Sequence, residues 1–97
     1  MDPGKPDIQI SDVVISTTGR DQGELFYVID TELPYLLLAN GKDRTLDRPK
    51  RKSRRHVQKV LRSETRVAEK LRNGDKVLNS ELRRDLAYLS QKMQSQT

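Results

Sequence analysis

Residues 13–29 read VVISTTGRDQGELFYVI, and this stretch decides the fold. Two runs rich in β-branched and aromatic residues, 13–17 and 25–29, flank a short polar segment. Such residues pack well on a pleated surface, so both runs are predicted to be strands. Gly19 and Gly23 supply the positive φ or the close backbone approach that a tight connection needs. We therefore expect a β-hairpin with Arg20 projecting from its tip.

Further strand signals continue to about residue 60. Residues 35–39 form an almost continuous apolar run suited to burial, and Asn40-Gly41 is a strong signal for a type I′ hairpin turn. Residues 44–46 are then expected to pair back as a fourth strand, with Leu46 inward. Pro49 is expected to end that strand because it cannot donate a ladder hydrogen bond.

The two ends of this β region are weaker in pattern. Val57 and Val60 could form a short closing strand, and residues 7–12 either add a strand or lead into the first one. Closing a sheet of four or five short strands removes exposed edges. We predict a mainly β fold with C-terminal α, in which residues 8–60 form an SH3-like β-barrel behind a flexible leader at 1–7.

Residues 61–97 change to a helical pattern and are predicted to be a helical extension. Residues 61–72 lack Gly and Pro, and Asn73-Gly74 is a typical helix stop. Asn79 or Ser80 can cap a second helix over 81–94. That helix carries one apolar stripe, made of Leu78, Leu82, Leu86, Leu89 and Met93. The stripe needs a partner, and we favour packing within the chain over packing on another molecule.

Composition limits the classes of protein. The 97 residues are 33% hydrophobic and 34% charged, which allows one small domain with a small core. No cysteine is present, so disulfides, cysteine metal sites and thiol catalysis are excluded. No apolar run approaches the roughly 20 residues that span a bilayer. The first residues lack the apolar core of a secretory signal, and we expect a soluble, cytoplasmic protein.

The positive charge is concentrated in one block. Residues 48–59 hold seven Lys and Arg residues and no acid, whereas the whole chain has a net charge of +5. Blocks of like charge repel themselves and often serve as interaction segments. Lys and Arg at this density neutralise phosphates and release counterions, so the block favours binding to a polyanion. It has no interleaved large apolar residues to insert into a membrane interface.

Catalysis is not indicated. His56 is the only histidine, and the cations around it lower its proton affinity. No carboxylate pair has a recognisable catalytic spacing, and no phosphate-cradling G-x-x-x-x-G-K-[ST] motif is present. We therefore expect no catalytic residue, no metal site, no cofactor and no small-molecule substrate.

Several short motifs together resemble the KOW domains of RNA-binding proteins. The match is carried by GRDQG at 19–23, VID at 28–30, LL at 37–38, NG at 40–41, RPKRK at 48–52 and HVQ at 56–58. The stretch 12–59 is similar to KOW proteins of the large ribosomal subunit, and more so to short bacterial relatives. One departure is that the glycine-bounded loop holds a single cation, Arg20, beside Asp21.

The resemblance implies a non-enzymatic protein of translation that binds ribosomal RNA, with the large subunit and its proteins as expected partners. In that family, the hairpin loop and basic segments contact the RNA backbone. The single cation of the loop shifts the expected main contact to the basic block. The candidate RNA-binding residues are Arg20, Arg48, Lys50, Arg51, Lys52, Arg54, Arg55 and Lys59.

The alternative is an adaptor of the translation or transcription machinery that binds another protein. Its contact would be the stripe of the second helix, formed by Leu82, Leu86, Leu89 and Met93. Tyr27 and Tyr35 are possible stacking platforms for bases. We expect Phe26 or Tyr27, whichever faces inward, to belong to the core, and Tyr35 stays undecided.

Overall fold

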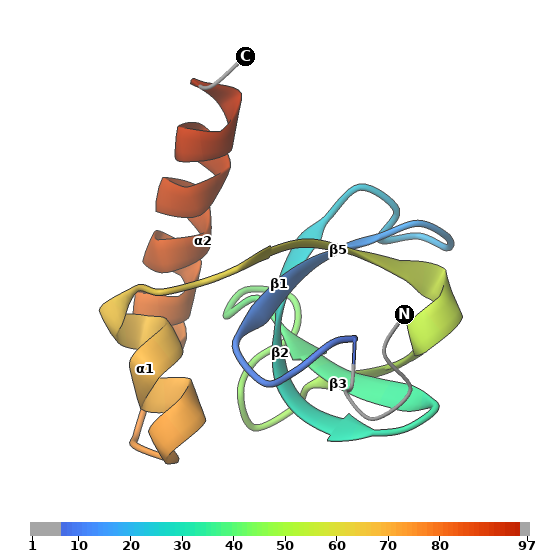
Figure 1. The fold of residues 1–97 in the computed structure, drawn as a ribbon, viewed down its shortest axis with the longest axis horizontal. Coiled ribbons are helices and arrows are strands. Elements are labelled where there is room, and N and C mark those ends of the chain that lie inside the picture. The colour runs from blue at the N-terminus through green and yellow to red at the C-terminus, as the bar shows by residue number, and fades with distance from the viewer. Residues whose placement is uncertain (1–6, 96–97) are drawn as a thin grey trace.

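A computed structural model describes residues 7–95, which fold into a curled β-sheet with two helices at its side (Figure 1). The elements, in chain order, are β1 (Asp12–Ser16), β2 (Leu25–Glu32), β3 (Tyr35–Ala39), β4 (Lys50–Ser53), the 3-10 turn η1 (Arg54–His56), β5 (Val57–Arg62), α1 (Arg66–Asn73) and α2 (Asn79–Gln94). The predicted flexible leader lies outside the described residues, apart from Asp7.

The strands form one antiparallel sheet in the order β4-β3-β2-β1-β5. The two edge strands, β4 and β5, are joined by η1, and the sheet curls as Figure 1 shows. The predicted mainly β fold with C-terminal α is confirmed, and this strand order is compatible with an SH3-like barrel. Residues 7–11 lead into β1 without forming a strand, and Ile8 is buried in the core.

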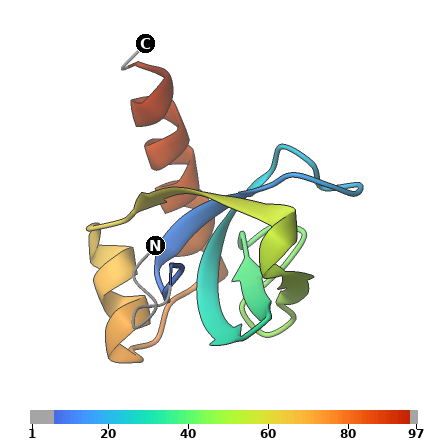
Figure 2. The same cartoon turned by 45° about the vertical axis from the view of Figure 1, so that its right-hand side comes forward.

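Both faces of the sheet are buried. Val14, Phe26, Val28, Leu36 and Leu38 pack inside the curled sheet. On the other face, Val13, Tyr27 and Ala39 occupy one row across three neighbouring strands. This row packs against the helices, which lie on the same side of the sheet in both views (Figures 1 and 2). The strands are therefore continuously apolar at their centres, as sheets covered on both faces are.

Phe26 and Tyr27 are therefore both core residues, although we predicted that only the one facing inward would be buried. The Tyr27 hydroxyl reaches the helical side, where it donates to Asp85 of α2 and lies 2.8 Å from Ser63 Oγ. Thr65, the N-cap of α1, donates to the same Asp85 carboxylate at 2.8 Å. Burial, reinforced by the Asp85 carboxylate, raises the pKa of Tyr27 to about 12. This polar network joins the sheet to both helices.

Helix α1 begins later than predicted, whereas α2 begins at Asn79, earlier than the predicted residue 81, and both helices end where predicted. The predicted N-cap of α2, Asn79 or Ser80, is wrong because both residues lie inside the helix. β5 continues to Arg62, so the predicted boundary at 60/61 falls inside a strand and α1 starts only at Arg66. Helix α1 ends at Asn73 as predicted, with Gly74 in the left-handed region at φ 74°. In α2 the N-cap is Leu78, whose N–H is bound by Glu81 at 3.2 Å. Neither helix of residues 7–95 has the length and apolar content of a bilayer-crossing segment.

The prediction of a fourth strand at 44–46 is wrong, because residues 40–49 form a loop. The Asn40 side chain accepts from the N–H groups of Lys42 and Arg44, and these bonds replace a ladder. The loop docks on α2 instead: Leu46 N–H donates to Asn79 Oδ1 at 2.8 Å, and Arg83 Nη1 donates to Gly41 O at 2.5 Å. β4 is formed by the basic residues that follow Pro49.

Gly41 permits this docking, and its replacement by alanine is expected to be costly. Its φ is +78°, and an added Cβ would collide with the Asn79 carbonyl and lie 3.1 Å from Arg83 Cγ. Backbone strain and overpacking together should lower the free energy of unfolding by about 3 kcal/mol. Urea unfolding at pH 7, followed by circular dichroism, measures the change.

Gly74→Ala is the matched control for this test. Gly74 has a similar φ of +74°, but no atom of residues 7–95 lies within 4 Å of its added Cβ. It should therefore lose only the strain component, about 1–2 kcal/mol. Equal losses in the two variants would contradict close packing of the loop on α2.

Candidate nucleic-acid interface

The basic block at 48–59 is built into the fold, where it forms β4, η1 and the start of β5. Along β4, side chains alternate between the two faces of the sheet. Lys52 pairs with Leu36 and Lys50 with Leu38, whose side chains both lie inside the curled sheet. Arg51 therefore belongs to the outer face. The strand divides the predicted phosphate-binding block into an inward and an outward set.

The inward lysines are neutralised by Asp21, from the loop between β1 and β2. Lys50 Nζ lies 2.6 Å from Asp21 Oδ2, and Lys52 Nζ lies 2.8 Å from Oδ1. Ser16 Oγ donates to the same carboxylate at 2.7 Å, and Lys52 also donates to the Thr18 carbonyl at 2.8 Å. Only 7% of the Lys52 side chain is exposed. We call Asp21, Lys50, Lys52 and Ser16 the Asp21 clamp.

The clamp controls the ionisation of its carboxyl group. Burial alone would raise the pKa of Asp21, but the hydrogen bonds from Lys50, Lys52 and Ser16 outweigh it and hold that pKa far below its usual range. The carboxylate is thus charged at every ordinary pH. Its negative charge offsets the charge of the two lysines, which makes them weaker sites for an anionic ligand than unpaired cations.

Two more predicted contacts are also engaged in structural ion pairs. Arg54 binds Asp7 through Nε at 2.9 Å and donates to the Val57 carbonyl at 3.1 Å. Lys59 lies 3.3 Å from Asp12, a fully buried carboxylate that Arg62 also contacts at 3.1 Å. Arg54 therefore joins Asp7 to η1, and Lys59 and Arg62 hold β1 against β5.

Five of the predicted contacts are exposed: Arg20, Arg48, Arg51, Arg55 and Lys59. Lys59 is paired with Asp12, which leaves the four arginines. Within residues 7–95, Arg20, Arg48 and Arg55 have no carboxylate within 4 Å, and Arg51 has only a marginal one at 4.0 Å, Glu32. Exposed arginines without strong partners are the cations that can exchange solvent for phosphate.

Arg51 and Arg55 share one groove with Tyr35. The groove has a volume of about 620 Å³ and is lined by Pro34, Tyr35, β4, Arg55 and His56. The Arg54 N–H donates to the Pro34 carbonyl at 2.8 Å, which ties the turn between β2 and β3 to η1. This bond brings residues some 20 positions apart to one surface. We call this surface the Tyr35 groove.

Arg20 is not part of the Tyr35 groove. It lines another hollow, of about 340 Å³, with Arg44, Lys50 and the acids Asp21, Glu24 and Asp43. Lys50 borders both hollows. The acids beside Arg20 make that hollow a poorer site for phosphate than the Tyr35 groove. The structure therefore brings Arg51 and Arg55 together and leaves Arg20 apart.

The predicted partner-binding stripe lies mostly in the core. Leu82, Leu86 and Leu89 are buried with Val13 and Tyr27, so the favoured packing within the chain is confirmed. Met93 is half-buried. The adaptor alternative loses three of the four residues on which it was based, because the covered face of the sheet is their partner.

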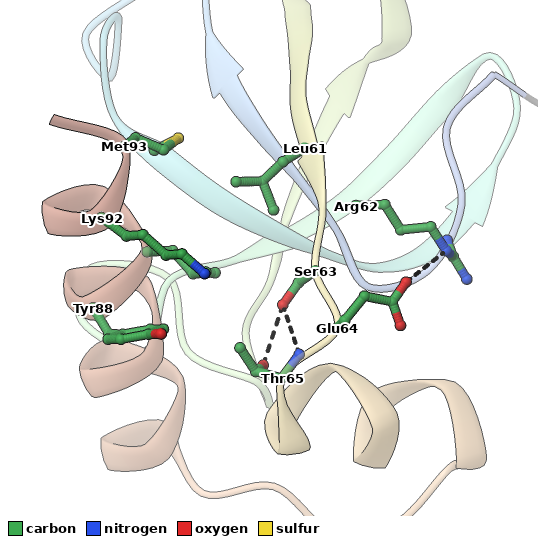
Figure 3. A pocket seen from close by; sticks show the side chains of 9 residues that line it. Leu61, Arg62, Ser63, Glu64, Thr65, Tyr88, Lys92 and Met93 are labelled. Atoms are coloured by element: carbon green, nitrogen blue, oxygen red, sulfur yellow. Dashed lines mark hydrogen bonds and ion pairs between the residues drawn. The ribbon is translucent and has the colours of Figure 1, made fainter. Parts of the chain in front are cut away.

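A third hollow, of about 500 Å³, lies beside the C-terminal end of the leucine stripe of α2. Figure 3 shows Tyr88, Lys92 and Met93 of α2 on one side and Leu61, Ser63 and Thr65 on the other. Its charged groups have mixed signs, since Arg62 and Lys92 are accompanied by Glu64. The acid makes this hollow less suited to an anion than the Tyr35 groove.

Metal binding is not supported by the arrangement of side chains. Across residues 7–95, no three His, Cys, Asp or Glu side chains gather in a way that could hold a metal ion. His56 lies in the Tyr35 groove among cations, where it can contribute a hydrogen bond or a flat ring.

The sequence missed two features of this site. The Asp21 clamp could have been suspected from the acid in the glycine-bounded loop, but its lysine partners are 29 and 31 positions away. The meeting of Tyr35 and Arg51 in one groove depends on the register of β3 with β4, which the sequence does not show. Neither a scan against protein-family models nor a search of curated protein sequences gives a match for this chain.

Proposed function

We propose that this chain is a non-enzymatic RNA-binding protein that uses the Tyr35 groove to contact the RNA backbone. The observation that carries the proposal is the sorting of the basic block. Lys50, Lys52, Arg54 and Lys59 are paired with carboxylates, whereas Arg51 and Arg55 stay exposed in one groove. Cations without strong partners beside an exposed aromatic ring suit a nucleic acid.

The choice of RNA and of the ribosome rests on the resemblance to KOW domains. It favours ribosomal RNA of the large subunit, with ribosomal proteins as neighbours, in the cytoplasm. Phosphate contacts of this kind position a protein on its ligand and carry no base sequence by themselves. Affinity should therefore depend strongly on salt and weakly on RNA sequence.

Reversing the two groove arginines tests the proposal. The double variant Arg51→Glu/Arg55→Glu should bind a mixed-sequence RNA oligonucleotide at least about tenfold more weakly than the wild type. Each lost phosphate contact should also reduce the slope of log K against log salt by about one. Fluorescence anisotropy of the labelled RNA, at salt concentrations from about 50 to about 300 mM, measures both the affinity and the salt slope.

The matched control is Arg66→Glu/Arg84→Glu, which reverses two exposed arginines of the helices. Because each reversal changes the charge by two, both double variants fall from the net charge of +5 to +1. The control should retain most of its affinity. If both variants lost the same RNA affinity, the loss would come from the lower net charge alone, and this result would contradict a localised binding site.

Sedimentation of tagged protein from cell lysate through a sucrose gradient tests the ribosomal part. We expect the wild type and the helix control to migrate with a ribosomal subunit at low salt. The groove variant should stay near the top. If the wild type also stays there at low salt, association with the ribosome is wrong even if RNA binding in solution is retained.

A further inference from the structure

Tyr35 is the exposed aromatic residue of the sheet. Phe26 and Tyr27 are buried in the two cores, and the fourth aromatic residue, Tyr88, lies on α2. Tyr35 begins β3, and 37% of its surface is exposed. An aromatic ring kept in solvent next to exposed cations has a different role from one that fills a core.

The Tyr35 ring is already stacked with Arg51. The Arg51 Cζ atom lies 4.0 Å from the centre of the ring. The contact follows from the antiparallel register, in which Tyr35 is opposite Ser53 and Leu37 is opposite Arg51. Cation–π contact and planar stacking pre-order the guanidinium, so less conformational entropy is lost when a third planar group is added.

We infer that Tyr35 and Arg51 form a stacking site for one unpaired nucleobase, so that the protein prefers single-stranded RNA to a continuous duplex. This inference rests on the proposed RNA-binding function and identifies the class of RNA. Bases stack on aromatic rings and on guanidinium planes alike. At about 620 Å³ the groove is within the size range of sites for small ligands, about 300–1,000 Å³.

The charges around the pair favour stacking over a pure phosphate clamp. Glu32 Oε1 lies 4.0 Å from Arg51 Nε, and its side chain is 56% exposed. A carboxylate at this place weakens phosphate binding by Arg51, but it does not oppose a neutral base. Arg55 lies in the same groove and has no carboxylate within 4 Å in the part of the chain that the structure describes, so it is the better phosphate contact.

A duplex cannot use this site. In an A-form helix the bases are stacked on one another, and their faces are closed to side chains. A base in a single strand, a bulge or a loop can turn onto the ring. The difference between single-stranded and duplex affinity is therefore the quantity that reports the stacking site.

The test compares Tyr35→Ala with Tyr88→Ala in the full chain. Tyr88 is the matched control, because it is 53% exposed and has its own cation, Lys92, at 6.0 Å from the ring. The probes are a labelled 12-nucleotide RNA of mixed sequence and the duplex of the same length, about the span of one to three small binding sites. Binding is measured by anisotropy at several salt concentrations.

We expect Tyr35→Ala to lose about 5- to 150-fold in affinity for the single strand, which corresponds to ~1–3 kcal/mol per stacked base. Its affinity for the duplex and its salt slope should stay at the wild-type values. Tyr88→Ala should bind both probes like the wild type, and Tyr35→Phe should retain the affinity for the single strand.

Tyr35→Trp provides a second readout that does not depend on loss of affinity. The chain has no tryptophan, so the new side chain is the only indole in the protein. Its emission should be quenched and shifted by the single strand, and much less by the duplex. Retained binding by this variant also shows that the altered strand folds.

The outcomes separate the two proposals. If Tyr35→Ala binds the single strand like the wild type while Arg51→Glu/Arg55→Glu does not, the stacking site is wrong and the phosphate site remains. Equal losses for single strand and duplex would also overturn the stacking site. If the wild-type protein binds neither probe at low salt, both proposals fail.

Discussion

Replacing Asp21 by asparagine is expected to lower the free energy of unfolding by about 3 kcal/mol. The change removes the negative charge beside Lys52, an almost fully buried cation that is left with neutral acceptors such as the Thr18 carbonyl at 2.8 Å. Breaking a buried ion pair from one side costs about 3–5 kcal/mol, because the other charge stays buried. We take the lower end since Lys50 is 24% exposed and can turn to solvent.

The same carboxylate should make stability depend on pH in acid. The pKa of Asp21 is depressed in the folded state from its ordinary value near 3.8. Its contribution is therefore complete above about pH 4 and is lost as the pH falls below that value. Urea unfolding from pH 7 to pH 2.5 should show the gap between wild type and Asp21→Asn narrowing only below about pH 4.

Two further variants assign the loss to the clamp. Asp43→Asn removes an exposed acid of the neighbouring loop and should change the free energy of unfolding by less than about 0.5 kcal/mol. The double variant Asp21→Asn/Lys52→Met should recover part of the loss, because a buried pair replaced on both sides is often tolerated. Additive losses in the double variant would contradict a direct coupling of Asp21 and Lys52.

The parts of the fold that follow from local pattern were predictable. Residues 13–17, 25–29 and 35–39 have the β-branched and aromatic composition of buried strands, and each overlaps a strand of the structure. Gly74 ends α1 through its left-handed conformation. These signals depend on a few neighbouring residues, so a single sequence contains them.

The parts that failed depend on contacts distant in sequence. β4 consists of Lys50-Arg51-Lys52-Ser53, which has neither strand propensity nor an apolar face. It becomes a strand because Asp21 neutralises its inward side and β3 supplies the ladder. The strand expected at 44–46 is instead a loop held by Asn79 and Arg83, from a helix more than 30 residues away.

The candidate site divides in the same way. A basic block at 48–59 is visible in the composition, but which of its cations are exposed depends on distant carboxylates. Asp7 binds Arg54, Asp12 binds Lys59, and Asp21 binds Lys50 and Lys52. Each acid precedes the block by about 30 residues or more in sequence. The exposed arginines of the block, Arg48, Arg51 and Arg55, are thus those to which the described residues give no close carboxylate partner.

Introducing aspartate at Leu86 is expected to abolish the fold under native conditions. Leu86 is 6% exposed and packs in the core between α2 and the sheet, beside Val13 and Tyr27. The change removes a buried leucine and buries an unpaired charge next to Asp85, at a cost of about 4 kcal/mol or more. A domain of this size has a total stability of about 5–10 kcal/mol. Circular dichroism and an amide NMR spectrum should show largely unfolded chains.

Ala87→Asp is the control, since it adds the same charge to an exposed neighbouring position of α2. It should lose less than about 1 kcal/mol, mainly through lower helix propensity. If Leu86→Asp instead kept the native spectrum and unfolding midpoint, α2 would separate from the sheet at little cost and its leucines could reach a partner. If Leu86→Asp unfolds as expected, any loss of binding by this variant reports the loss of the fold. A partner-binding role for α2 then has to be tested at Tyr88 and Met93, which line the hollow of about 500 Å³ beside that helix.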